Sequence, residues 1–237
     1  MHIKATSLLA AAIGFGVAQA ALAADMPVKA PIVKAAPFYD WTGFFAGVQG
    51  GAAWGSVPNS FVIGGATTGQ PNFSTRGGLF GVHAGYNWQS SSMVYGLVGD
   101  VEWSNIKGDD GGLSGVTDEL KSDWRGSFRG RVGVAWDRVL LYGTGGLAWA
   151  NLKYSLLAVA PATGSTSAST TTFGWTLGGG AEYAFTPAWS AFVEYRYSDF
   201  GSHSAAFAAT TFSVAQTVNY SYRDSAVRGG ITYHFGH

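Results

Sequence analysis

The sequence predicts an all-β fold, an eight-stranded antiparallel transmembrane β-barrel with long extracellular loops and short periplasmic turns. Apolar and polar side chains alternate with a period of two in segment after segment, which is typical of strands with two different faces. Only 12% of the 237 residues are charged and 35 residues are glycine, whereas soluble domains contain about 25% charged residues. The connections between these segments are alternately short and long.

The stretch around which the chain is organised is residues 172–201, TFGWTLGGGAEYAFTPAWSAFVEYRYSDFG. We interpret it as two strands joined by a tight turn at residues 186–188. One face is rich in apolar and aromatic residues: Phe173, Trp175, Leu177, Ala181, Tyr183, Phe185, Trp189, Ala191, Val193, Tyr195 and Tyr197. The other face carries glycine, serine, threonine and single charges. This pattern indicates an apolar face toward lipid and a small or charged face toward a barrel lumen.

Six further segments alternate in the same way and bring the predicted strand count to eight. They span residues 41–54, 77–89, 93–105, 123–136, 139–150 and 223–235. In residues 77–89 the predicted lipid face consists of Phe80, Val82, Ala84, Tyr86 and Trp88. Residues 139–150 are apolar or glycine on both faces, and there we place Leu140, Tyr142 and Ala148 toward lipid.

The connections support the barrel and set its orientation. The short ones are residues 90–92, 137–138 and 186–188, and the long ones are residues 55–76, 106–122, 151–171 and 201–222. Short turns on one side and long loops on the other are typical of outer-membrane barrels, whose short turns lie in the periplasm. Because an open sheet edge in hydrocarbon leaves backbone groups unpaired, the last strand is expected to pair with the first.

The N-terminal residues predict export. Lys4, an apolar stretch at 5–17 and the small-x-small sequence Ala21-Leu22-Ala23 indicate a signal peptide at 1–23, cut before Ala24, with a cut after Ala20 as the alternative. Residues 24–40 contain three prolines and are expected to form a periplasmic linker, followed by the barrel at 41–237. The absence of cysteine excludes disulfides and thiolate chemistry. Basic and acidic residues number 14 each, which leaves no electrostatic footprint for nucleic acid.

Charged residues gather on the predicted lumen face. Four are acidic and four are basic: Asp100, Glu102, Glu182, Glu194, Arg129, Arg131, Arg196 and Arg228. The interior of an eight-stranded barrel is just wide enough for side chains to fill, and unpaired buried charges cost several kcal/mol. We therefore expect a structural belt of paired charges that fills the lumen. The alternative is a narrow, charged, selective pore.

Other candidate sites are weaker. His83 faces the predicted lumen, but no serine and carboxylate stand at a spacing typical of acyl-transfer enzymes, so no catalytic site is expected. His203 lies in the last long loop without a second histidine, which favours a solvated residue over a metal or haem ligand. Asp109, Asp110, Asp118 and Glu119 are interpreted as a hydrophilic loop, with weak divalent-cation binding as the alternative. The glycine runs 143–146 and 178–180 lie inside strands and lack the helix of a phosphate-binding loop. We expect no cofactor and no metal.

Four segments carry a family resemblance: WTGFFAGVQGG, RGRVGVAWDRVLLYGTGGLAWA, GWTLGGGAEYAFTPAWSAFVEYRYSDFG and VRGGITYHF. Together they resemble the small outer-membrane immunogenic surface antigens of alphaproteobacteria, porin-family proteins with a barrel similar to the OmpA transmembrane domain. The resemblance implies an eight-stranded barrel in the outer membrane of a Gram-negative bacterium, surface exposure and antigenicity, without an established chemical activity. Haemin or host-surface binding occurs among such relatives, but no motif here carries it over residue by residue.

The C-terminal strand resembles a barrel-assembly signal formed by Arg228, Gly230, Tyr233 and Phe235. It departs from the usual pattern because Gly236 and His237 follow the final aromatic residue.

We therefore expect a structural, surface-exposed outer-membrane protein, a surface antigen that serves envelope integrity or surface contact through its loops. The alternative is a narrow porin-like channel for small solutes or ions. The expected partners are outer-membrane lipid and lipopolysaccharide, the barrel-assembly machinery, and host or environmental ligands at the loops, but not nucleic acid.

Overall fold

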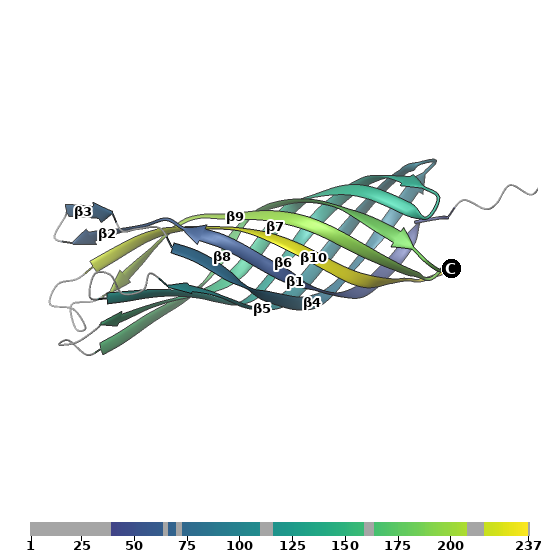
Figure 1. Ribbon diagram of the computed structural model, residues 1–237. Coiled ribbons are helices and arrows are strands. Elements are labelled where there is room, and N and C mark those ends of the chain that lie inside the picture. Colours follow the sequence, from purple (N-terminus) through teal and green to yellow (C-terminus); the bar gives the residue numbers. More distant parts are fainter. Residues whose placement is uncertain are drawn as a thin grey trace, which may run out of the picture. The chain divides into compact units, whose positions relative to one another are not determined.

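The computed structural model describes residues 39–63, 66–69, 73–109, 116–158, 164–207 and 216–236, and these residues form antiparallel strands joined by turns (Figure 1). The predicted signal peptide and all but the last two residues of the predicted linker lie outside the described residues. No helix in the described part of the chain has the length and apolarity needed to cross a membrane.

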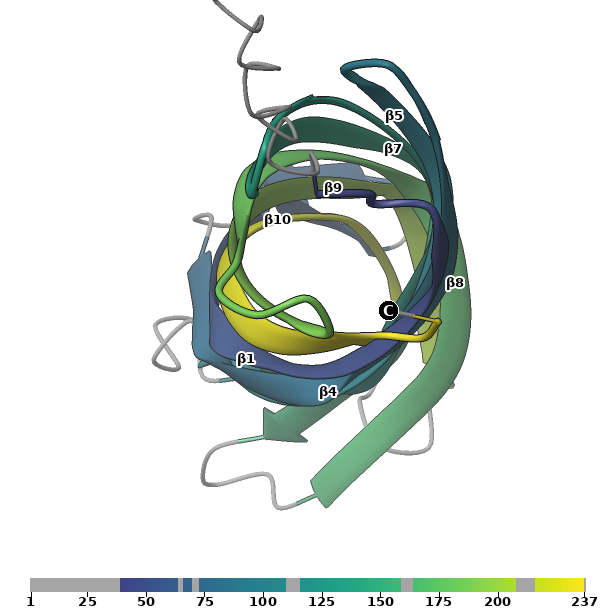
Figure 2. The same cartoon turned by 90° about the vertical axis from the view of Figure 1, so that its right-hand side faces the viewer.

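Eight strands form the barrel wall. They are β1 Gly43–Val57, β4 Phe73–Ser90, β5 Met93–Asp109, β6 Val116–Trp136, β7 Val139–Ala158, β8 Gly164–Ala184, β9 Trp189–Phe207 and β10 Gln216–His234. Each strand pairs with its neighbour, and β1 pairs with β10 from Phe45 opposite His234 to Ser56 opposite Arg223. Viewed from the end that carries the C-terminus, the strands close into a ring (Figure 2). The predicted eight-stranded barrel and the closing pair are confirmed.

The short turns lie at the predicted places. β4 and β5 are joined at residues 91–92, β6 and β7 at 137–138, and β8 and β9 at 185–188. Ser91 and Asp137 have positive φ values of 57° and 51°. Two-residue hairpin turns require such left-handed backbone because only then does the twist of the turn match the twist of the strands.

The strands extend farther than predicted at the opposite end of the barrel. Most of the predicted loops 106–122, 151–171 and 201–222 is strand, and within 55–76 an additional hairpin forms from β2 Asn59–Ile63 and β3 Ala66–Gly69. β2 pairs with the outer part of β10. Ser74 and Ser165, which the sequence placed in loops, lie in β4 and β8. These extensions bury apolar side chains such as Ile106, Leu120 and Leu152 on their inward face, and pairing with the neighbouring strand supplies their backbone hydrogen bonds.

The predicted faces of β7 are wrong. Leu140, Tyr142 and Ala148 are buried in the lumen, whereas Leu141 and Leu147 are 46% and 67% exposed on the outside. The register with β6 sets this orientation, because it pairs Leu140 with the inward Ala135 and Leu141 with the outward Val134. Both faces of β7 consist of apolar residues or glycine. The sequence of this strand therefore does not indicate which face points toward the lumen.

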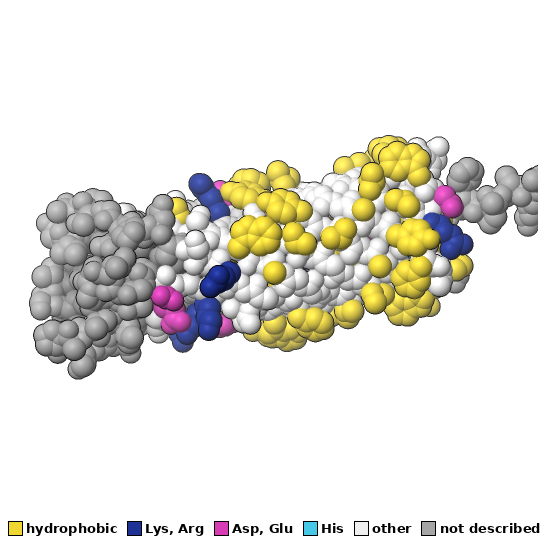
Figure 3. Space-filling view, in the orientation of Figure 1, with side chains coloured by type: hydrophobic (Ala, Val, Ile, Leu, Met, Phe, Trp, Pro, Cys, Tyr) yellow, Lys and Arg dark blue, Asp and Glu magenta, His cyan; other side chains and the backbone are white. Residues whose placement is uncertain are grey.

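The outward faces of the other strands are as predicted. Large apolar side chains are exposed along the middle of the face seen in Figure 3. Phe44, Phe80, Phe128, Phe173 and Leu177, from four strands of the ring, are all more than half exposed and form an apolar band. Such a surface would be unfavourable in water. It matches the apolar band by which a transmembrane barrel contacts lipid.

Val82 tests this assignment. It lies near the middle of the membrane-facing part of β4 and is half exposed. Val82→Arg should lower the free energy of unfolding by about 2–4 kcal/mol because a charge enters hydrocarbon. Ser74→Arg, on the same strand beyond the apolar band, should be nearly neutral. Equilibrium denaturant unfolding of barrels refolded in lipid vesicles measures both, and equal losses would contradict the assigned faces.

Candidate functional site

The centre of the lumen is filled by three carboxylates and three guanidinium groups. Asp100 and Glu102 come from β5, Arg129 from β6, Glu194 and Arg196 from β9, and Arg228 from β10. Strict alternation turns all six side chains inward, where each is at most 4% exposed. β5 and β9 stand on opposite sides of the eight-stranded ring. Ion pairs between these two strands therefore cross the whole lumen.

The distances describe one connected network. Arg196 donates to Asp100 Oδ1 at 3.0 Å and to Glu102 Oε2 at 2.6 Å. Arg228 donates to Glu102 Oε1 at 2.7 Å and also to Glu194. Arg129 donates to Asp100 Oδ2 at 3.1 Å and to Glu194 Oε1 at 2.7 Å. Every charge in the network faces at least two opposite charges, which is the arrangement that offsets the cost of removing ions from water.

A second layer of charge lies toward the outer end of the lumen. Arg125 makes a bidentate contact with Asp224, which also accepts a hydrogen bond from the Tyr222 hydroxyl at 3.1 Å. Arg125 and Asp224 were missing from the predicted belt, although Arg125 shares the parity of Arg129 and Asp224 that of Arg228. With this pair, five acidic and five basic side chains face the lumen in the described part of the chain.

The third layer lies toward the periplasmic end. Arg131 pairs with Glu182, and its guanidinium carbon lies 3.7 Å from the centre of the Tyr142 ring. Glu182 also accepts a hydrogen bond from Ser190 Oγ at 2.5 Å. With this layer, the structure places all eight residues of the predicted belt inside the barrel.

Ser190, His234 and Glu182 meet in the lumen, although no sequence spacing predicted this group. Ser190 Oγ lies 2.9 Å from His234 Nε2, and Glu182 Oε1 lies 3.3 Å from that same nitrogen. In a hydrolytic triad the acid contacts the other ring nitrogen, and the histidine accepts the hydroxyl proton. Here the hydroxyl donates to Glu182, so His234 donates to Ser190. The geometry describes a buried hydrogen-bond network and not an activated nucleophile.

The periplasmic mouth is sealed by two residues that precede β1. Trp41 is fully buried, contrary to its predicted place on the first strand, and its ring contacts Tyr39 edge-on at 4.7 Å between centroids. Trp41 Nε1 donates to the Asp137 carbonyl at 3.2 Å, and the Tyr39 hydroxyl donates to the Pro187 carbonyl at 2.8 Å. Burial, and secondarily the Glu182 carboxylate, raise the pKa of Tyr39 to about 12, so the hydroxyl keeps its proton.

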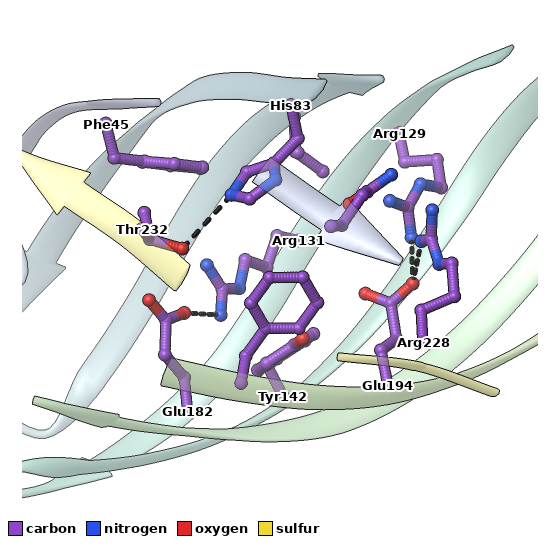
Figure 4. A pocket seen from close by; sticks show the side chains of 12 residues that line it. Phe45, His83, Arg129, Arg131, Tyr142, Glu182, Glu194, Arg228 and Thr232 are labelled. Carbon is purple, nitrogen blue, oxygen red and sulfur yellow. Dashed lines mark hydrogen bonds and ion pairs between the residues drawn. The ribbon is translucent and has the colours of Figure 1, made fainter. Parts of the chain in front are cut away.

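The described residues leave a small cavity between these layers. A cavity of about 20 Å³ lies near His83, Arg131 and Glu194 (Figure 4), which is room for about one water molecule. His83 Nε2 lies 3.1 Å from Thr232 Oγ1, while its Nδ1 is buried without a protein partner. A water in the cavity would satisfy that nitrogen. His83 has no serine or carboxylate partner in the described lumen, and the geometry assigns it no chemistry.

The candidate ligands outside the membrane do not converge. His203 Nε2 contacts the Phe200 carbonyl at 2.7 Å, and the imidazole lies against the Tyr220 ring. Glu119 pairs with Lys121 at 2.8 Å. Among the described residues no group of three or more potential ligands is placed to hold a metal ion. Asp110 and the side chain of Asp118 lie outside that part.

Coupling across the lumen can be measured directly. Asp100→Ala, Arg129→Ala and the double variant should show an interaction energy of about 0.5–3 kcal/mol in equilibrium unfolding, because each change removes the partner of the other. The same cycle for Asp100 and the exposed Arg138 should give no interaction. Additive losses at Asp100 and Arg129 would mean that water separates the two groups.

Comparisons with known proteins agree with this architecture. Residues 7–235 match the family described as outer membrane protein beta-barrel domain. The 31 kDa outer-membrane immunogenic protein of Brucella melitensis biotype 1 is 34% identical over 243 residues, which cover 97% of this chain and 99% of the relative. The 22 kDa outer membrane protein of Rhizobium leguminosarum bv. viciae is 34% identical over 212 residues, covering 88% and 82%. The crystal structure of the outer membrane protein OprG from Pseudomonas aeruginosa shares the fold, with a TM-score of 0.51, 13% identity and coverage of 81% and 97%.

Proposed function

Because this chain belongs to the outer membrane protein beta-barrel domain family and resides in the outer membrane, we propose that it is a structural, surface-exposed protein without enzymatic activity. Its lumen is closed, and its contacts with the outside are made at the extracellular end of the strands and in the loops there. The relative from Brucella melitensis is named an outer-membrane immunogenic protein. Surface exposure of this chain would make it accessible to antibodies in the same way.

The observation that carries the proposal is the pairing of charges across the lumen. Arg196 on β9 reaches Asp100 and Glu102 on β5, the opposite wall. An ion that passed this level would have to separate buried pairs, which costs several kcal/mol for each charge left uncompensated. The five acids and five bases of the described lumen also balance, so they leave no net charge that would select an ion of one sign.

The inward glycines do not open a channel. Glycine removes side-chain volume, but the space beside three of these residues is filled by neighbouring rings. A methyl group placed on Gly47 would lie 2.7 Å from the His83 ring, one on Gly85 would lie 2.5 Å from Phe45, and one on Gly230 would lie 2.6 Å from Phe192. These glycines make room for aromatic side chains. This observation weighs against the narrow porin-like channel.

Conductance and surface recognition together test the proposal. Purified, refolded protein should migrate differently on a denaturing gel before and after boiling and should give no steady ionic current in a planar bilayer. Antibodies raised against whole cells should bind the wild type and lose binding when the extracellular hairpin β2–β3 is shortened, while heat-dependent migration persists. Steady, well-defined currents would overturn the closed-lumen function in favour of the channel.

We also propose the route to the membrane. Residues 1–23 would be removed on export, and the assembly machinery would recognise Tyr233 and Phe235, which point outward from the end of β10. Phe235→Ala should reduce the folded fraction in the outer membrane, whereas removal of Gly236 and His237 should not. If the folded fraction were the same in both variants, Phe235 would not be part of the signal.

A further inference from the structure

Four basic residues form a continuous row on the outside of the barrel. The strand register places Arg76 of β4 opposite Lys107 of β5, Lys107 opposite Lys121 of β6, and Lys121 opposite Lys153 of β7. Each lies next to a buried, inward residue, such as Ile106, Leu120 or Leu152, so the four side chains point outward. We name this set the basic row.

Among the described residues, the row holds most of the positive charge outside the lumen. In the described part of the chain six basic residues lie outside the lumen, and only Arg138 and Arg223 are not in the row. Directly opposed like charges destabilise a sheet, so this alignment needs an anion to balance it. Within the described residues Lys121 pairs with Glu119 at 2.8 Å, while no carboxylate reaches ion-pair distance from Arg76, Lys107 or Lys153. Asp109 and Glu119 oppose each other farther out, and Asp123 is exposed beside the row.

The position of the row specifies the kind of anion. The Trp103 and Trp124 rings lie 4.1 Å apart at the outer margin of the apolar band, and aromatic residues mark the interface of membrane barrels. On β7, Lys153 lies four residues beyond Trp149. The distance between these two residues is about 13 Å along the strand, at 3.3 Å per residue. Tilt of the strand reduces this to about 10 Å along the membrane normal. Figure 3 shows basic side chains at this boundary between the apolar band and the outer end of the barrel.

We propose that the basic row binds a phosphorylated glycolipid of the outer leaflet. Its phosphates would contact Lys107, Lys153 and Arg76, which have no described acidic partner. Its acyl chains would lie against the apolar wall directly below, where Val101 and Phe128 are exposed. A soluble anion would match the charges of the row but not this apolar wall, so the combination selects an amphipathic ligand.

Lipid binding to refolded protein tests the site without reference to conductance. The probe is bisphosphorylated lipid A, and binding to the barrel in non-ionic detergent is measured by native mass spectrometry. Lys107→Gln/Lys153→Gln should weaken binding about 30-fold, the loss that two basic residues cause at an anionic membrane surface. The matched control is Arg138→Gln/Arg223→Gln, which removes the same charge elsewhere and should bind like wild type. All four side chains are exposed, and heat-dependent gel migration checks that both variants fold.

Dephosphorylated lipid A should bind wild type about as weakly as the phosphorylated lipid binds the Lys107→Gln/Lys153→Gln variant. Equal binding of the two lipids, or equal losses in the two double variants, would overturn the assignment. Displacement of lipid A by an equal concentration of inorganic phosphate would also overturn it, because the site would then recognise phosphate without the lipid.

Discussion

Replacing Arg228 by alanine should lower the free energy of unfolding by about 3–5 kcal/mol, one of the largest effects expected for any single change in this protein. The Arg228 side chain is fully buried and contacts Glu102 at 2.7 Å, Asp100 at 3.4 Å, and Glu194. After its removal, two guanidinium groups would remain for three carboxylates in the central network. The measured loss of stability includes the cost of leaving a carboxylate buried without a partner. It is therefore larger than the net stabilisation that the ion pairs provide.

The matched control lies on the same strand. Arg223 pairs with Asp199 at 3.0 Å, but its side chain is 55% exposed. Arg223→Ala should therefore cost about 0–1 kcal/mol, as for other exposed ion pairs. Equilibrium unfolding in denaturant, on protein refolded in detergent micelles, measures both variants. Similar small losses would mean that water screens the charges of the lumen, and the closed-lumen proposal would fail with them.

Trp41→Ala should also cost about 3–5 kcal/mol, the usual range for removing a buried tryptophan. Its indole contacts His234 at 5.5 Å between ring centroids, and its backbone amide donates to Gln89 Oε1 at 2.7 Å. The substitution leaves a cavity at the periplasmic mouth. It should not produce an ionic current, because the charge network at the centre of the lumen remains intact.

Trp41→Phe separates packing from hydrogen bonding. Phenylalanine retains most of the ring volume but loses the Nε1 hydrogen bond to the Asp137 carbonyl, so about 1 kcal/mol should be lost. Thermal or denaturant unfolding of the two variants gives the comparison. If the two losses were equal, the ring would not fill the mouth of the barrel.

Much of this structure could be predicted from residues that are local in the chain. Alternation along β4, for example, separates the exposed Phe80 and Val82 from the buried His83, and this requires no knowledge of other strands because side chains in a strand alternate by geometry. The same parity placed Asp100 and Arg129 inside. β7 is the exception, since both of its faces are apolar or glycine and the period carries no information there.

The barrel, its closing pair, most of its faces and the charge balance of its lumen therefore follow from the amino-acid sequence alone. Which charges meet, such as Arg196 with Asp100 across the ring and Arg125 with Asp224, depends on the three-dimensional fold. It also brought Ser190 to His234, placed Trp41 in the periplasmic mouth and aligned the basic row. The physical reason is that parity is a property of one strand, whereas contacts across a lumen depend on the stagger between all strands of the closed ring.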